Sequence, residues 1–152
     1  MAAYFFDSSA LVKLYHREIG TPAVDRLANS DGNVVRISRL TAAELISAFA
    51  IKVRTQSISR EDADSLLRQF QSDIATGTLE VFSIGEPQFV MTELLIKRHA
   101  FNLQLRTLDA LQLAVALRLR DRKLVDQFVA ADKVLCQVAE LEGFAVVNPE
   151  SV

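Results

Sequence analysis

The sequence predicts one α/β domain over residues 1–152, built on a parallel β-sheet, and three observations support this prediction. The length of 152 residues fits the usual size of about one domain per 150 residues. Half of the residues are hydrophobic, which is enough for a buried core without a metal or a disulfide. Short apolar runs alternate with long helical patterns, and the chain has no linker, repeat or low-complexity stretch.

Five short apolar runs predict the strands. Each run is rich in Val, Ile or Phe and is bounded by polar or turn-forming residues, such as Asp31-Gly32-Asn33 ahead of the second run. The predicted strands cover residues 3–6, 34–38, 79–84, 127–130 and 144–147.

The intervening helices are predicted from the spacing of apolar residues and from the residues at helix ends. Thr21 is expected to cap a helix that has Pro22 in its first turn, and Ser59 opens a helix that Gly77 ends. Thr107 is expected to cap a later helix. The predicted helices cover residues 9–16, 21–29, 41–54, 59–76, 86–99, 107–120 and 132–141.

Composition and charge exclude several classes of protein. Lys plus Arg number 17 and Asp plus Glu number 19, so a net charge of −2 argues against disorder and against a strongly basic nucleic-acid coat protein. Cys136 is the only cysteine, and His16 and His99 are the only histidines, so disulfides and zinc sites are not expected. The N-terminus lacks a basic leader and no run of 18 apolar residues is free of charge, which predicts a cytoplasmic protein without a membrane span.

Four acidic residues are predicted to meet at one edge of the sheet. Asp7 follows the first strand and Asp132 follows the fourth. Glu44 is expected in the first turn of the helix after the second strand, and Asp109 in the first turn of the helix that Thr107 opens. Because the active site of an open α/β sheet lies beyond the carboxyl ends of its strands, these four carboxylates are candidate catalytic residues.

The surroundings of these acids favour a divalent cation. Glu44 and Asp109 each lie in an otherwise apolar stretch, where an unpaired carboxylate is penalised by desolvation. Several carboxylates close together also repel one another. Mg²⁺ or Mn²⁺ removes both penalties, since these ions take oxygen ligands. We therefore predict a metal site that activates water against a phosphodiester.

Each acid lies within a longer motif. The motifs are Phe6-Asp7-Ser8-Ser9-Ala10-Leu11-Val12-Lys13, Leu40-Thr41-Ala42-Ala43-Glu44-Leu45, Leu105-Arg106-Thr107-Leu108-Asp109-Ala110-Leu111-Gln112-Leu113-Ala114 and Phe128-Val129-Ala130-Ala131-Asp132-Lys133. In this order and spacing the chain resembles the PIN-domain family, and most closely the VapC-type toxins of bacterial toxin–antitoxin modules. The resemblance spans essentially the whole chain.

The resemblance implies a Rossmann-like, three-layer α/β/α fold whose parallel five-stranded sheet has the order 3-2-1-4-5. It also implies an Mg²⁺- or Mn²⁺-dependent endoribonuclease that acts as a toxin, with the four acids as catalytic metal ligands, an RNA substrate and a cognate antitoxin. Gln112 stands where many relatives carry His, and Ala130 where many carry Thr or Ser. Neither departure removes a carboxylate.

Each acid also has a purely structural interpretation. Asp7 and Asp132 can cap the helices that follow them, and Asp109 can supply favourable charge near a helix N-terminus. Thr41-Ala42-Ala43-Glu44 has the sequence of a capping box, in which the Glu44 side chain would accept a bond from the Thr41 backbone. Capping and metal binding do not exclude each other.

Further residues are candidates for supporting or RNA contacts. Lys13, Arg39 and Arg106 flank the predicted acidic edge, where cations can contact phosphate, although solvated surface cations are the common alternative. Ser8 and Thr107 join them as supporting candidates. No histidine is placed to activate a serine, so nucleophilic serine chemistry is not expected.

Other functions remain as alternatives. A phosphatase of the haloacid dehalogenase type needs a second Asp two residues after Asp7, where Ser9 stands, and a receiver domain needs an Asp after the third strand, where Ile84-Gly85-Glu86 follows. A PIN-fold binding module that does not use its acids and an RNA-processing nuclease without a toxin role also fit the sequence.

A homodimer is predicted from an apparent surplus of apolar side chains on the helices. These side chains exceed what one face of a small sheet covers, and exposed apolar patches mark partner sites. The alternative is that they are ordinary core residues. The side chains are Phe49, Leu66, Leu67, Phe70 and Phe89.

Overall fold

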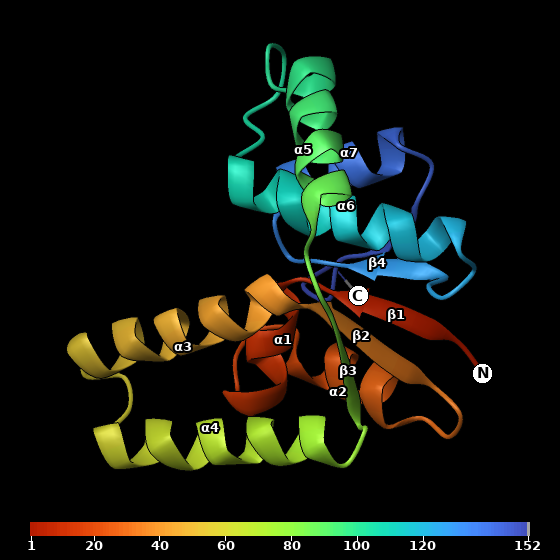
Figure 1. The fold of residues 1–152 in the computed structure, drawn as a ribbon. Coiled ribbons are helices and arrows are strands. Elements are labelled where there is room, and N and C mark those ends of the chain that lie inside the picture. The colour runs from red at the N-terminus through yellow and green to blue at the C-terminus, as the bar shows by residue number, and fades with distance from the viewer. Residues whose placement is uncertain (152) are drawn as a thin grey trace.

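A five-stranded sheet forms the centre of the protein, and every neighbouring pair of strands is parallel (Figure 1). The structure is a computed structural model that describes residues 1–151. The strand order is β3-β2-β1-β4-β5, as the family resemblance implied. The strands are β1 (Ala3–Phe6), β2 (Val34–Ser38), β3 (Leu79–Phe82), β4 (Gln127–Val129) and β5 (Ala145–Val147).

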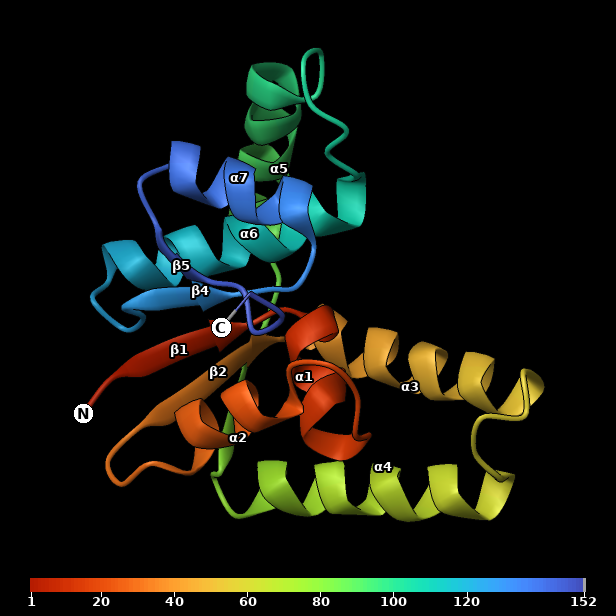
Figure 2. The ribbon, with the colours of Figure 1, turned by 180° about the vertical axis from the view of Figure 1, so that it is seen from behind.

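Helices cover both faces of the sheet, which confirms the three-layer α/β/α architecture. Figure 1 and the reverse view in Figure 2 show α1 to α4 on one face and α5 to α7 on the other. Among residues 1–151, none of these helices is both long and apolar enough to cross a membrane. The helices are α1 (Ser8–Tyr15), α2 (Thr21–Asn29), α3 (Arg39–Arg54), α4 (Arg60–Ala75), α5 (Glu86–His99), α6 (Thr107–Asp121) and α7 (Lys133–Leu141).

The central strand β1 divides the core in two. Successive side chains of a strand point to opposite faces of the sheet. Phe5 accordingly packs with the helices α5 to α7 and stacks on Phe128 of β4, with 5.7 Å between the ring centroids. Tyr4 and Phe6 pack with α1 to α4. The buried β1 therefore holds its carboxyl end, where Asp7 follows, in the middle of the molecule.

The pair α3 and α4 extends beyond the sheet as two antiparallel helices (Figure 1). Phe49 and Phe70 are fully buried in this part of the core, and Leu66 and Leu67 are half-buried against it. Of the five side chains from which a homodimer was predicted, only Phe89 on α5 is strongly exposed, at 51%. The predicted apolar surplus is therefore wrong for four of the five residues, because α4 packs onto α3 and completes the core there.

One predicted helix start and one predicted helix cap are wrong. The helix α3 begins at Arg39 with Ser38 as its N-cap residue, two residues earlier than predicted. The N-cap residue of α2 is Gly20, not Thr21, and its φ of 92° is a conformation that favours glycine. The Thr21 hydroxyl instead donates to the Lys13 carbonyl at 3.0 Å and accepts from the Glu18 amide at 3.0 Å. A contact with the end of α1 thus takes the Thr21 hydroxyl away from the predicted cap.

The remaining differences are small. Thr107 is the first residue of α6 instead of its cap, and Arg106 holds the cap position without a side-chain bond. The strands β3, β4 and β5 are each shorter than predicted, because the parallel ladder ends where the neighbouring strand ends. The prediction for α5 agrees with the observed helix at both ends.

Candidate active site

The structure places the four acidic side chains around the carboxyl ends of the central strands. Asp7 is the N-cap residue of α1, directly after β1, and Asp132 is the N-cap residue of α7, shortly after β4. The strands β1 and β4 are neighbours, so these two helix starts lie side by side. Asp109 lies in the first turn of α6 and Glu44 in the second turn of α3. The four carboxylates influence one another electrostatically: Asp7 with Asp109 and Glu44, and Asp109 with Asp132 and Glu44.

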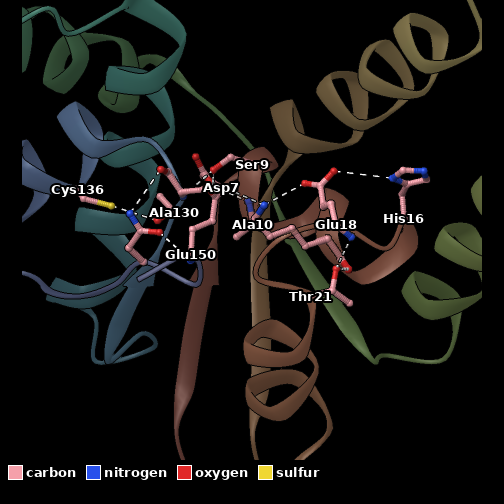
Figure 3. Close-up of polar contacts among 12 residues, drawn as sticks. Asp7, Ser9, Ala10, His16, Glu18, Thr21, Ala130, Cys136 and Glu150 are labelled. Carbon is pink, nitrogen blue, oxygen red and sulfur yellow. Dashed lines mark hydrogen bonds and ion pairs between the residues drawn. The ribbon is translucent and has the colours of Figure 1, made fainter. Parts of the chain in front are cut away.

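Asp7 is a buried carboxylate that forms no ion pair with any cation among residues 1–151. It is 3% exposed, and burial raises its pKa to about 7. Its Oδ1 accepts hydrogen bonds from the Ser9 hydroxyl at 2.6 Å and the Ala10 amide at 3.0 Å, which oppose the rise (Figure 3). The negative charges of Asp109 and Glu44 add to it. The predicted cap role is confirmed, and it occupies only one oxygen of the carboxylate.

The Ser9 hydroxyl connects the carboxyl end of β1 with the carboxyl end of the neighbouring strand β4, a role that the sequence did not reveal. Its Oγ donates to Asp7 and accepts from the Ala131 amide at 2.9 Å. Ala131 follows β4, so one hydroxyl joins the loops at which Asp7 and Asp132 begin their helices. Ser9 is therefore a residue that fixes the Asp7 carboxylate, and the cap of α1 is Asp7 itself.

Asp109 is a second carboxylate with a raised pKa. Burial is the largest cause, Asp132 and Glu44 add to it, and the guanidinium of Arg106 opposes it. Arg106 and Thr107 are exposed at the start of α6, where they can reach a bound ligand. Both therefore stay candidates for RNA contacts.

Glu44 does not form the predicted capping box, because α3 begins at Arg39 and places Glu44 in its second turn. Its Oε1 instead accepts from the Ser8 hydroxyl at 3.0 Å and from Nε2 of Gln112 at 2.8 Å. Both donors come from other helices, α1 and α6. Ser8 is thus placed as a supporting residue of Glu44.

Asp132 does cap its helix. Its Oδ1 accepts from the Leu135 amide at 2.9 Å, which matches the alternative interpretation of this residue. The raised pKa of Asp109 shows that the charge of Asp132 also reaches the acidic group. Capping and membership of the group therefore coexist in one side chain.

Lys13 has a different role from the one considered for it. Its side chain is buried, and its ammonium forms ion pairs with Glu18 at 3.0 Å and Glu150 at 2.9 Å. These contacts join α1 to the loop before α2 and to the segment after β5. Lys13 is a structural cation, since two carboxylates already surround it, whereas Arg39 is exposed near the start of α3.

The acids fit a hydrated divalent cation by their chemistry. All four offer hard oxygen ligands, and those of Asp7 and Asp109 are held at raised pKa values by burial and by like charges. Within residues 1–151, no three His, Cys, Asp or Glu side chains are grouped closely enough to hold a metal ion together. Mg²⁺ tolerates this arrangement because it keeps several waters and binds through one or two carboxylates.

A groove of about 510 Å³ lies next to Glu44, between α1, α3 and the start of α6. Ser8 and Glu44 form its polar end, and apolar side chains line the rest, among them Val12, Leu40, Ile51 and Leu108. Of the four acids, Glu44 is the one that lines this groove.

Comparisons with known proteins agree with this fold. The sequence matches the PIN domain family over residues 4–141. A sequence comparison with curated proteins gives no match.

Several solved structures share the fold over nearly their whole length. FitAcB from Neisseria gonorrhoeae has a TM-score of 0.68 at 16% identity and covers 98% of this chain and 99% of its own. VapC20 from Mycobacterium tuberculosis, described as a sarcin-ricin loop cleaving toxin, has a TM-score of 0.65 at 18% identity, covering 95% and 97%. VapBC2 from Rickettsia felis, bound to a DNA fragment from its promoter, has a TM-score of 0.64 at 17% identity, covering 95% and 97%.

The family match covers most of the chain, the strand order is the one expected for that family, and the four acids stand at the carboxyl edge of the sheet. The chain belongs to the PIN domain family.

Proposed function

We propose that the protein is a metal-dependent endoribonuclease and the toxin of a toxin–antitoxin pair. One observation carries the proposal: Asp7 and Asp109 are held at raised pKa values by burial and by neighbouring acids, with no buried cation to compensate them. A structural cluster would gain stability from buried counter-charges, whereas here the exposed guanidinium of Arg106 opposes the rise, and it does so at Asp109 alone. Perturbed carboxylates grouped at the ligand edge of an α/β sheet are typical of a functional site.

Asp7, Glu44, Asp109 and Asp132 would hold Mg²⁺ or Mn²⁺. Such an ion, when bound, lowers the pKa of a coordinated water and stabilises charge on a phosphate. The chain's own residues orient the ligands: the Ser9 hydroxyl and the Ala10 amide hold Oδ1 of Asp7, and the Leu135 amide holds Oδ1 of Asp132. Each bond occupies one oxygen, so the carboxylates are pre-oriented before the ion binds. Arg106 at the rim supplies a positive charge for the phosphate backbone.

The proposed partner is a cognate antitoxin, and the groove beside Glu44 is the surface proposed for it. Solved structures with the same fold include a toxin–antitoxin complex from Klebsiella pneumoniae and VapBC2 from Rickettsia felis. An apolar groove next to the acids allows a bound segment to block access of RNA. The partner would thereby inhibit the enzyme without altering its fold.

We propose a homodimer from a smaller set of exposed apolar side chains than the sequence predicted. Phe89, Val90 and Leu94 of α5 are each about half exposed, at 51%, 47% and 45%, and form an apolar surface on that helix. Light scattering at micromolar concentration tests this directly. A stable monomer would refute the homodimer.

Purified protein with end-labelled RNA tests the enzymatic proposal. We expect cleavage of single-stranded or loop RNA in Mg²⁺ or Mn²⁺, products with a 5′-phosphate and a 3′-hydroxyl, and no cleavage in EDTA. Cleavage that persists in EDTA contradicts the metal mechanism. For the toxin role, induced expression of the wild-type protein should arrest growth, whereas Asp7→Asn should not.

A further inference from the structure

Gln112 is a buried amide in contact with one of the four acids. It lies on α6, close to one turn after Asp109, and is 1% exposed. Its Nε2 donates to Oε1 of Glu44 at 2.8 Å and to Oγ1 of Thr41 at 2.8 Å. Its Oε1 accepts from the Ser38 hydroxyl at 2.8 Å and from the Thr41 hydroxyl at 3.2 Å. A glutamine that is almost wholly buried is thus satisfied at both ends.

Glu44 determines which way this amide faces. An ionised carboxylate only accepts hydrogen bonds, so it requires the NH₂ group of Gln112 on its side. The hydroxyls of Ser38 and Thr41 can donate or accept, and they adapt to the carbonyl end. The two hydroxyls therefore anchor the amide, and the amide presents its donor to Glu44.

The hydrogen bonds around Gln112 use a serine hydroxyl that would otherwise cap α3. Ser38 holds the N-cap position of α3, yet its hydroxyl makes no capping bond and donates to Gln112 instead. Serine is favoured at this position because it caps, so its use for Gln112 indicates that the network serves something other than the start of α3. Ser8 holds the same Oε1 of Glu44 from α1.

We infer that Gln112 is a positioning residue that orients the Glu44 carboxylate for a divalent cation; this inference rests on the proposed function. Two donors hold Oε1, while Oε2 of Glu44 has no hydrogen bond to any residue in the described part of the chain. Gln112 is neutral, so it orders the carboxylate without cancelling its charge. A lysine or arginine in its place would compete with the cation for Glu44.

Calorimetric titration of the metal-free protein with Mn²⁺ alone tests this inference. Residues that orient metal ligands typically contribute about 10- to 100-fold to metal affinity, so Gln112→Met should weaken Mn²⁺ binding by that factor. The matched control is Gln88→Met on α5, which is also buried and whose Oε1 accepts from the Gly85 amide at 2.7 Å. The control should lower the melting temperature and leave the Mn²⁺ affinity unchanged.

A double-mutant cycle shows whether Gln112 acts through Glu44. In the Glu44→Gln background, adding Gln112→Met should change the Mn²⁺ affinity by less than about twofold, because the side chain it positions no longer carries a charge. Equal effects in both backgrounds overturn the inference. If Gln112→Met does not fold, Ser38→Ala combined with Thr41→Val removes the two anchors, keeps Gln112, and should weaken Mn²⁺ binding severalfold.

Nuclear magnetic resonance of the metal-free protein separates this inference from the proposed function. The side-chain NH₂ signal of Gln112, assigned by its loss in Gln112→Met, should be protected from exchange and should shift in Glu44→Gln. A solvent-exchanging signal overturns the inference even if the wild type binds Mn²⁺ and cleaves RNA. A wild type that neither binds Mn²⁺ nor cleaves RNA instead overturns the proposed function, whatever the signal shows.

Discussion

The two ends of the short helix α1 carry buried charges in opposite electrostatic surroundings. Asp7 at its start and Lys13 near its end are each 3% exposed. Lys13 lies between the carboxylates of Glu18 and Glu150. The charged side chains that act on Asp7 are Asp109 and Glu44, which carry the same sign as Asp7. The helix α1 thus has a buried carboxylate without a counter-charge at one end and a buried ammonium with two counter-charges near the other.

The difference distinguishes a structural ion pair from a site that is built for a ligand. Burial would lower the pKa of Lys13, but its two carboxylate partners outweigh burial and raise it. At Asp7, burial and like charges both raise the pKa, and hydrogen bonds from Ser9 and Ala10 only moderate the rise. A buried charge without a counter-charge destabilises the folded protein. We attribute this cost to function, since a bound cation would remove it.

Asp7→Asn should cause the largest effect. An asparagine keeps the oxygen that caps α1 but loses the charge, so the fold should persist while RNA cleavage falls by about a thousandfold, ~4 kcal/mol of activation free energy. The measurement is the single-turnover rate in Mn²⁺. The matched control is Asp121→Asn, an aspartate whose side chain is 72% exposed at the end of α6, and it should cleave at the wild-type rate. If the Asp7→Asn protein still cleaves RNA at the wild-type rate, the acidic group has no catalytic role.

Glu44→Gln should follow, with cleavage reduced by about a hundredfold. The amide oxygen of glutamine can accept the bonds from Ser8 and Gln112, so α3 should keep its position and the metal-free melting temperature should be unchanged or higher. The exposed Glu93→Gln on α5 is the control. A near wild-type rate for Glu44→Gln would reduce the catalytic group to three acids.

The pH dependence of stability should show the uncompensated charge directly. Because the pKa of Asp7 is raised from 3.8 to about 7, the folded protein binds more protons than the unfolded chain between these values. The free energy of unfolding of the metal-free protein should therefore fall as the pH rises from 5 to 7, by about 2–3 kcal/mol at 1.36 kcal/mol per unit. The carboxylates with lowered pKa, Glu18 and Glu142, lose their contribution only below about pH 4.5, whereas Asp109, whose pKa is also raised, adds to the slope in the same direction as Asp7.

Denaturant unfolding at pH 5, 6, 7 and 8 measures this slope. Asp7→Asn should reduce it and leave the smaller slope due to Asp109, and Mn²⁺ should restore stability at pH 8 in the wild type by mass action. A wild-type slope that the substitution leaves unchanged would show that another group is responsible.

Lys13→Met should have the smallest effect on function and a moderate effect on stability. Removal of one partner of a fully buried pair costs about 3–5 kcal/mol, and partial exposure of the Glu18 and Glu150 side chains reduces this to about 2 kcal/mol. Cleavage at 25 °C should stay within twofold of wild type. The control is Lys97→Met, an exposed lysine near the end of α5, which should change neither quantity. Loss of cleavage in a folded Lys13→Met protein would place Lys13 in the site after all.

Local pattern was enough to predict a parallel α/β sheet and the edge of it at which the four acids lie. The strands 3–6 and 34–38 and the helix 86–99 have the predicted bounds, because short apolar runs and helix-start residues act over a few positions. The acids were found because residues after parallel strands share one edge of the sheet. The strand order came from the family resemblance, since no spacing along the chain specifies which strands pair.

Partners far apart in the sequence decided the rest. Gln112 reaches Ser38, Thr41 and Glu44 across about 70 positions, and Lys13 reaches Glu150 across 137. The capping box at Thr41 failed because Ser38 starts the helix earlier, and the predicted apolar surplus failed at Phe49 and Phe70 because α3 and α4 pack together and bury both rings. Hydrophobic periodicity therefore specifies which elements form, since it acts within each segment. Only the packed structure specifies whether a buried polar group meets an opposite charge, a like charge or a neutral amide, because that depends on which segments become neighbours.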